Sequence, residues 1–398
     1  MKKINSIVRG AALLALCGVM MFSAVSCGTP KKAAGNGTPA ARLLPTSDKH
    51  LQAEVLKICK EANLPSIQVC YTDPVRTVSF VVTNKDFYAD TSHARYLKRP
   101  FDNLTVYEAA SISKVPLSYL ACKMADEGKL DLDKPLWEYW PGLLDLFASD
   151  AAKERAKVIT PRICMTHTTG LDNKTYRNME FKYKTGAFNY SGPGIYILQR
   201  TLEHLWGEKL DVYSKRVLFD KLGMEHTNYS WQPYYDEYFP YGFRDSGPTY
   251  QKWNTKGKPG CNAAYSMRTT AEEFTKFLQF FMKGGDLSRK MYDEMTRGQV
   301  MVKDFGASGK VYRGLGWVVA DDAQIGHYLH HGGNNQSFRG LAVIAPETER
   351  TLVYFYNGAP LKDYNVHDAM TRLFFNTNES IIPHQGAAIH SAAPAKKK

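Results

Sequence analysis

Residues 109–115 read Ala109-Ala110-Ser111-Ile112-Ser113-Lys114-Val115 and contain the chain's only serine that lies three residues before a lysine. If a helix begins at Ser111, its hydroxyl and the amine of Lys114 lie on one face, and the first-turn N–H groups can bind developing negative charge. A serine hydroxyl becomes a good nucleophile when a base takes its proton, and a lysine can be that base if burial or nearby cations lower its pKa. Alone, the tetrapeptide is equally compatible with an N-capping serine beside a surface lysine.

The rest of the chain has strand-like ends and a helical middle. Apolar residues between Leu51 and Cys59 recur at helical spacing, residues 105–290 are mainly helical in pattern with long loops, and a final helix is expected at 365–375. Segments rich in β-branched and aromatic residues lie at 67–71, 78–82, 315–320, 341–345 and 351–356. The pattern predicts one antiparallel sheet built from both ends of the chain, a mostly helical second lobe, and a site in the cleft between them.

Further motifs accompany the Ser-x-x-Lys segment in a fixed order and span most of the chain. Together they resemble the serine β-lactamase-like family, which comprises class C β-lactamases, DD-peptidases and family VIII esterases. The resemblance implies an α+β fold of the β-lactamase/transpeptidase type, with helices flanking the antiparallel sheet, and a serine hydrolase that works through an acyl-enzyme. The matching segments are 127–135, 165–171, Tyr190-Ser191, Leu222-Gly223-Met224, 266–274, Gly314-Leu315-Gly316-Trp317 and His330-His331-Gly332-Gly333.

The resemblance assigns catalytic roles to Ser111, Lys114 and Tyr190. Ser111 is the acylated nucleophile, and Lys114 and Tyr190 handle its proton. A phenol with an ordinary pKa of about 10 needs nearby positive charge to act as a base, and Lys114 is the expected source. Gly192 stands where the family usually has an asparagine that contacts the acyl amide of the substrate. This departure favours ester chemistry over peptide or β-lactam recognition.

The segment 330–333 takes the place of the family's Lys-Thr-Gly strand. By resemblance, the N–H group of Gly333 joins that of Ser111 in an oxyanion hole, while His330, His331, Gly332 and Gly192 belong to the substrate-binding surface. A histidine is largely neutral at pH 7 and anchors a carboxylate less strongly than a lysine does. Efficient β-lactam hydrolysis is therefore not favoured.

Neither the histidines nor the cysteines indicate a metal site. His327, His330 and His331 would gather on a helix, but the glycines that follow and the strand-like surroundings spread them over both faces. Apart from Cys17 and Cys27, an odd number of scattered cysteines remains, which indicates buried single thiols instead of a disulfide framework. We expect no metal ion and no organic cofactor.

The first 27 residues have the features of an export signal. Lys2 and Lys3 precede an apolar stretch, and small residues precede Cys27. This pattern resembles a bacterial lipobox in which Cys27 becomes the lipidated first residue; an ordinary secretory signal is the alternative. The predicted organisation is a lipoprotein signal peptide at 1–27, a flexible tether at 28–48, one hydrolase domain at 49–377 and a disordered tail at 378–398.

Charge and location complete the functional prediction. The net charge of +12 comes partly from lysines at the two ends, and no basic helix, zinc-finger spacing or RNA-binding signature indicates nucleic-acid binding. We expect a cell-envelope protein, as a periplasmic or outer-membrane lipoprotein or, alternatively, a soluble periplasmic or secreted one. Its substrate is predicted to be a small molecule or peptide with an ester or amide carbonyl.

Several activities are compatible with that substrate class. A general esterase or acyltransferase ranks level with a DD-peptidase-like enzyme, and a β-lactamase follows. From a different functional class, a sensor or binding protein could retain the fold without turnover. The intact set of Ser111, Lys114 and Tyr190 favours an enzyme.

Overall fold

The computed structural model describes residues 47–173, 175–250 and 260–377 of the chain. The predicted signal peptide with Cys27, nearly all of the predicted tether and the predicted tail lie outside these residues. None of the helices in the described ranges has both the length and the apolar character that a membrane span requires.

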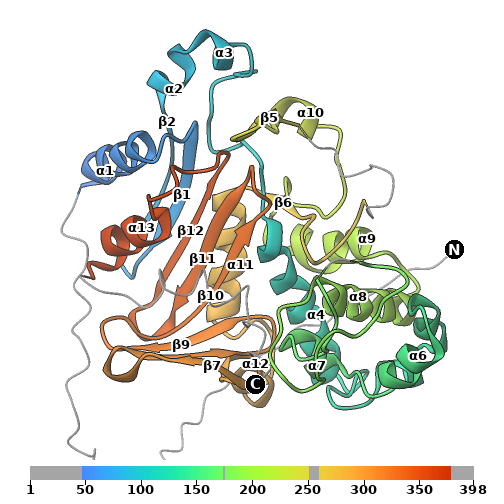
Figure 1. The fold of residues 1–398 in the computed structure, drawn as a ribbon. Helices are drawn as coiled ribbons and strands as arrows, with labels where there is room; N and C mark the ends of the chain where they lie inside the picture. The colour runs from blue at the N-terminus through green and yellow to red at the C-terminus, as the bar shows by residue number, and fades with distance from the viewer. Residues whose placement is uncertain (1–46, 174, 251–259, 378–398) are drawn as a thin grey trace, which may run out of the picture. The chain divides into compact units, whose positions relative to one another are not determined.

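An eight-stranded antiparallel sheet organises these residues (Figure 1). Its strands follow the spatial order β2-β1-β12-β11-β10-β9-β8-β7, so both ends of the chain contribute to it. The predicted antiparallel sheet is confirmed. The strands are β1 (Ser66–Thr72), β2 (Thr77–Thr83), β7 (Val300–Asp304), β8 (Gly309–Arg313), β9 (Val318–Asp322), β10 (Gly326–Asn334), β11 (Arg339–Ala345) and β12 (Arg350–Tyr356).

The predicted strand segments fall on β1, β2, β9, β11 and β12, whereas β7, β8 and β10 carry weaker sequence signals. β9 begins at Val318 and not at Leu315, because the preceding residues form a tight turn. In that turn the N–H of Gly314 donates to the carbonyl of Trp317, and Gly316 has a φ of 85°, which favours glycine.

Helices cover both faces of the sheet. α1 (Asp48–Glu61) and α13 (Val366–Phe375) pack on one face, and α11 (Ala271–Met282) packs on the other, against β1, β11 and β12. Because successive side chains of a strand point to opposite faces, β12 is buried along its whole length. α13 confirms the predicted final helix.

The middle of the chain is mainly helical, as predicted. A short 3₁₀ turn, η1 (Ala110–Ser113), leads into α4 (Lys114–Asp126) and packs against β10 and β11, which brings the start of α4 to the sheet. The other helices are α2 (Lys85–Ala89), α3 (Thr91–Ala94), α5 (Leu136–Tyr139), α6 (Asp150–Ala156), α7 (Pro161–Met165), α8 (Gly192–Trp206), α9 (Leu210–Ser214), α10 (Tyr235–Tyr238) and α12 (Arg289–Thr296). Two short ribbons pair β3 (Tyr107–Glu108) with β6 (Arg268–Thr269) and β4 (Gly242–Arg244) with β5 (Gly247–Thr249).

Candidate active site

Ser111 lies in η1, the turn that connects β3 to α4. The residue before it, Ala110, is fully buried and has a φ of 48°, in the left-handed region that non-glycine residues rarely adopt. Such backbone strain costs about 1–3 kcal/mol and persists where surrounding packing enforces it, often at functional sites. The turn leaves Ser111 half-buried, at the end of α4 that faces β10.

Lys114 is the first residue of α4, and its side chain is buried. Its Nζ donates to the Ser111 Oγ over 3.1 Å and to the carbonyl of Ala264 over 2.6 Å. Burial, and then the positive charge of Arg313, hold the pKa of Lys114 well below its usual range. Since no carboxylate in the described residues forms an ion pair with it, Lys114 has the environment of a neutral amine that can accept a proton.

Tyr190 immediately precedes α8, and the structure brings it to the same place. Lys114 Nζ lies 4.9 Å from the centre of the Tyr190 ring, and Arg313 Cζ lies 5.3 Å from it. Burial raises the pKa of the Tyr190 phenol to about 12, whereas Arg313 and a hydrogen bond with Ser111 act in the opposite direction. Ser111, Lys114 and Tyr190 are thus in mutual contact, although Tyr190 is distant in sequence.

His167 supports Tyr190. It has a φ of 58° and is buried, and its ring lies 4.3 Å from the Tyr190 ring, centre to centre. Its Nδ1 lies 3.2 Å from both the backbone N and the carbonyl O of Ser191, the N-cap of α8. These contacts indicate a structural role for His167, because they fix the ring against which Tyr190 packs.

β10 borders the site with two histidines that face opposite sides of the sheet. His331 Nδ1 donates to the carbonyl of Gly332 over 2.8 Å, and burial together with Arg313 and Lys114 holds its pKa well below the usual range. His330 lies on the other face, near Tyr328. Both line a cavity of about 410 Å³ that also includes Tyr190 and Gly332. The cavity therefore reaches both faces of the sheet past the edge of β10.

The backbone of β10 has a definite hydrogen-bonding direction near Gly333. The N–H of Asn335 donates to the carbonyl of Phe338, across the turn to β11. Because this direction alternates along an antiparallel strand, the N–H of Gly333 points toward β11 and that of Asn334 toward the opposite edge. β9 leaves this edge open, since its pairing with β10 ends at His330. The N–H of Gly333, which the sequence assigned to the oxyanion hole, therefore faces the pairing with β11 and not the open edge.

Gly333 has a second, steric role. A Cβ at this position would lie 2.3 Å from the carbonyl oxygen of Ala109 and 3.3 Å from the Cβ of Ala110. Only a glycine allows β10 to approach the nucleophile turn this closely.

The described residues contain no group of three His, Cys, Asp or Glu side chains that could hold a metal ion. His327 is engaged with Asp321 at 2.8 Å, away from His331. The cysteines of this part of the chain are free thiols: Cys59, Cys70, Cys122 and Cys164 are buried, and Cys261 is half-buried.

The sequence model of the β-lactamase family matches residues 53–376. The chain belongs to the β-lactamase family. A β-lactamase of Escherichia coli (strain K12) is 21% identical over 295 residues, covering 69% of this chain and 74% of that protein. An N-acetylmuramyl-L-alanine amidase of Bacillus subtilis (strain 168) is 27% identical over 160 residues, covering 34% of this chain and 36% of that protein.

A solved structure agrees with this membership. D-alanine carboxypeptidase AmpC from Burkholderia cenocepacia matches with a TM-score of 0.65 and 17% identity, over 83% of this chain and 98% of that one. At this identity the match supports the fold alone. The predicted family and fold class are confirmed, and the β-lactamase family supports a serine hydrolase that acts on amide or ester bonds.

Other side chains occupy the place of the family's asparagine. The N–H of Gly192 donates to Oδ1 of Asn173 over 2.7 Å. A Cβ at Gly192 would lie 2.5 Å from the Tyr176 hydroxyl and 3.0 Å from that Oδ1. Asn173 is exposed, and with its oxygen engaged it still has an NH₂ group to offer. The sequence pattern did not reveal this replacement, because Asn173 and Tyr176 belong to a segment outside the family's motifs.

Arg313 is the other residue that the sequence pattern did not reveal. It ends β8 and lines the cavity beside Tyr190 and His331. The available signal was its position directly before the Gly314-Leu315-Gly316-Trp317 motif of the β-lactamase family, as a charge at the end of a strand.

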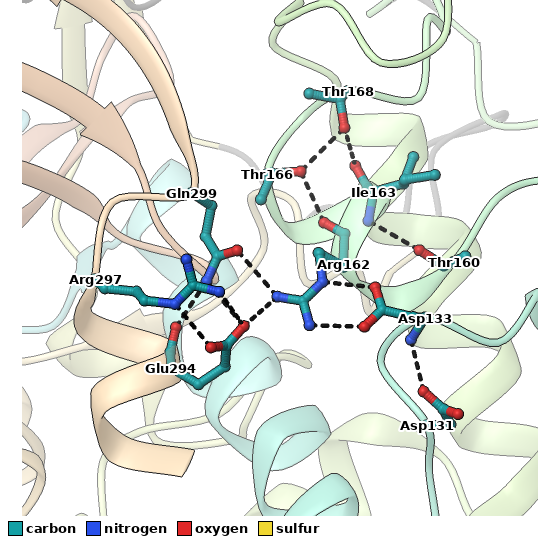
Figure 2. A network of polar contacts seen from close by, with 10 residues as sticks. All are labelled: Asp131, Asp133, Thr160, Arg162, Ile163, Thr166, Thr168, Glu294, Arg297 and Gln299. Atoms are coloured by element: carbon teal, nitrogen blue, oxygen red, sulfur yellow. Dashed lines mark hydrogen bonds and ion pairs between the residues drawn. The ribbon is translucent and has the colours of Figure 1, made fainter. Parts of the chain in front are cut away.

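A polar network fixes the segment that carries His167 (Figure 2). Arg162 of α7 donates to both carboxylate oxygens of Asp133, over 2.6 and 2.8 Å, and pairs with Glu294 of α12. Its own carbonyl accepts a hydrogen bond from the Thr166 hydroxyl over 2.8 Å. Since His167 follows Thr166, the network connects α12 to the residue that supports Tyr190.

Proposed function

We propose that this member of the β-lactamase family cleaves ester or amide substrates through an acyl-enzyme on Ser111. The observation that carries the proposal is the buried Lys114 amine, 3.1 Å from the Ser111 hydroxyl and without a carboxylate partner among the described residues. A lysine in this environment favours its neutral form and can take the serine proton. Tyr190, in contact with both, is suited to pass that proton to the leaving group.

The reaction balances without a cofactor. Ser111 Oγ bonds to the carbonyl carbon while its proton passes to the pair formed by Lys114 and Tyr190. The bond from that carbon to the leaving group breaks, and the leaving oxygen or nitrogen takes the proton. Water, or an acceptor alcohol or amine, then attacks the acyl carbon by the reverse proton path and restores the Ser111 hydroxyl.

Two backbone N–H groups are proposed to hold the oxyanion. Ser111 supplies one, at the start of the η1–α4 segment. The direction of the β10 ladder favours Asn334 as the second donor over Gly333, whose N–H faces β11. Loss of one such donor typically costs about 3 kcal/mol of transition-state stabilisation.

Among the possible activities, an esterase or acyltransferase and a DD-peptidase-like enzyme remain level, with a β-lactamase third. Buried His331 favours its neutral form, which argues for weak carboxylate anchoring from β10. The polar groups of Asn173 and Tyr176 beside Gly192 support recognition of acyl groups that contain a carbonyl. A sensor that acylates without turnover is the second candidate, because an unusual acyl site can slow deacylation.

The decisive experiment combines a fluorophosphonate probe with a substrate panel. We expect the probe to label Ser111, and we expect turnover of a short-chain nitrophenyl ester with slower turnover of a chromogenic cephalosporin. Ser111→Ala should lose both labelling and turnover. A lasting adduct without steady-state turnover would favour the sensor, and undiminished activity of Ser111→Ala would contradict the proposal.

We also propose that the protein is anchored to the envelope through a lipid on Cys27. The proposal rests on the N-terminal sequence, where a basic and apolar stretch ends at this cysteine. Metabolic labelling with a fatty acid should modify the wild-type protein and not Cys27→Ser. Equal recovery of both proteins in the soluble fraction would support the ordinary secretory signal.

A further inference from the structure

Among the residues that the structure describes, Arg313 is buried without the carboxylate or hydrogen-bond partners that usually accompany a structural arginine. Its side chain is among the largest of the fully buried ones. Its Nε and Nη2 atoms are buried and have no hydrogen-bond partner in the described residues, and no carboxylate there forms an ion pair with it. Burial lowers the pKa of the guanidinium to about 10, so the group still carries its charge at neutral pH.

The groups that face Arg313 are aromatic, neutral or basic. Its Cζ lies 5.3 Å from the ring centres of both Phe188 and Tyr190, which is a favourable distance for a cation beside an aromatic face. Its positive charge also lowers the pKa of Lys114, of His167 and of His331, after the larger effect of burial. None of these groups is a carboxylate. An uncompensated buried charge is expensive for the fold, and such groups cluster where charge develops during a reaction.

The position of Arg313 explains where the positive charge of this site comes from. The two histidines of β10 lie in the segment that the family fills with a lysine, and burial favours the neutral form of His331. Arg313 reaches the same proton-handling pair from β8, two strands away across the sheet. In this chain the positive charge beside Lys114 and Tyr190 thus comes from Arg313 on β8 and not from a lysine on β10.

We propose that Arg313 is a positioning residue for acyl transfer: its fixed positive charge keeps Lys114 in the neutral form and stabilises negative charge on the Tyr190 oxygen during proton transfer. The inference rests on the proposed function of Ser111, Lys114 and Tyr190. Arg313 itself forms no bond to the substrate and exchanges no proton. Its effect is electrostatic, so a lysine at this position should replace it in part and a neutral side chain should not.

The first test compares Arg313→Gln with Arg313→Lys by ester turnover and by the rate of Ser111 labelling with a fluorophosphonate, both across pH. Without the repulsion from Arg313, Lys114 holds its proton more tightly, so the acidic limb of the Arg313→Gln profile should move to higher pH. We expect a 10- to 100-fold loss in kcat with little change in KM. Arg313→Lys should retain most of the rate and the wild-type limb. A uniform loss without a shifted limb, or equal behaviour of the two variants, would overturn the proposal.

A second test does not depend on activity. NMR of protein labelled at the lysine Cε, with Lys114 assigned through Lys114→Arg, reports the titration of this amine directly. Its midpoint should rise in Arg313→Gln and not in Arg313→Lys, with thermal unfolding confirming that both variants are folded. An unmoved midpoint contradicts the inference even if the enzyme is active. Conversely, a moved midpoint with an unlabelled Ser111 would retain the electrostatic role and refute the proposed acyl-enzyme.

Discussion

Two buried arginines of this chain, Arg268 and Arg313, have opposite surroundings. Arg268 is 0% exposed and lies 3.8 Å from the Glu108 carboxylate, and it is enclosed by aromatic rings that include Trp231 at 4.9 Å. Arg313 is 1% exposed and also contacts aromatic rings, but no carboxylate in the described residues pairs with it. The two arginines are equally buried, but within the described part of the chain only Arg268 has a carboxylate beside it. We therefore expect Arg268 to stabilise the fold and Arg313 to act on the titratable groups around it.

The largest expected effect comes from removing the other buried basic group without a carboxylate partner among the described residues, Lys114. Lys114→Met keeps a side chain of similar length and removes the base, so acylation of Ser111 should slow by about 10²–10⁴-fold. The free energy of unfolding should not fall, because a buried amine without a counter-charge is costly to the fold. Fluorophosphonate labelling rates and urea denaturation measure the two quantities. A nearly normal labelling rate would remove Lys114 from the mechanism.

The second prediction tests the comparison itself through stability. Arg268→Met removes the positive charge beside the buried Glu108 carboxylate, which should lower the free energy of unfolding by about 3–5 kcal/mol. Arg313→Met strands no charged partner and should be neutral or stabilising. Denaturant titrations of the two matched variants decide the point. If both lost the same stability, the distinction between the two arginines would have no energetic basis.

The third prediction concerns pH and stability. The pKa of Lys114 is held below its ordinary value in the folded protein, so between the two values the unfolded chain binds the extra proton. The wild-type free energy of unfolding should therefore rise with pH relative to Lys114→Met, by about 1.4 kcal/mol per pH unit within this window. Urea denaturation at pH 7 to 9 checks the sign. A difference that does not change with pH would mean that Lys114 keeps its proton in the folded state.

The smallest effect is expected at Asn173, an uncharged side chain that serves as a contrast to the two arginines. In Asn173→Asp the oxygen that accepts from Gly192 remains and the NH₂ donors are lost. Loss of one hydrogen bond, worth about 0.5–1.5 kcal/mol, should lower kcat/KM up to about tenfold for esters whose acyl part carries an amide. Simple acetate esters serve as the control and should be unaffected. An equal loss on both ester types would indicate a disturbed Gly192 backbone.

The sequence predicted what is local and could not predict what depends on the sheet. Ser111 and Lys114 are one turn apart, so their contact follows from the helix alone. Tyr190 followed from the family's motif order, and its contact with them is a result of the tertiary fold. The proximity of Arg313 requires the order of strands, and the direction of the Gly333 N–H requires the register of β10 on β11. Neither is encoded in a short pattern, because both depend on pairings between distant segments.

The close approach of Gly333 to Ala109 makes the position of the nucleophile turn sensitive to the size of residue 333. A methyl group at position 333 would lie 2.3 Å from the Ala109 carbonyl oxygen, so β10 and the nucleophile turn would have to move apart. A Gly333→Ala protein should therefore have a displaced Ser111 and slower acylation. The distance between two chain segments far apart in sequence thus sets the reactivity of the nucleophile.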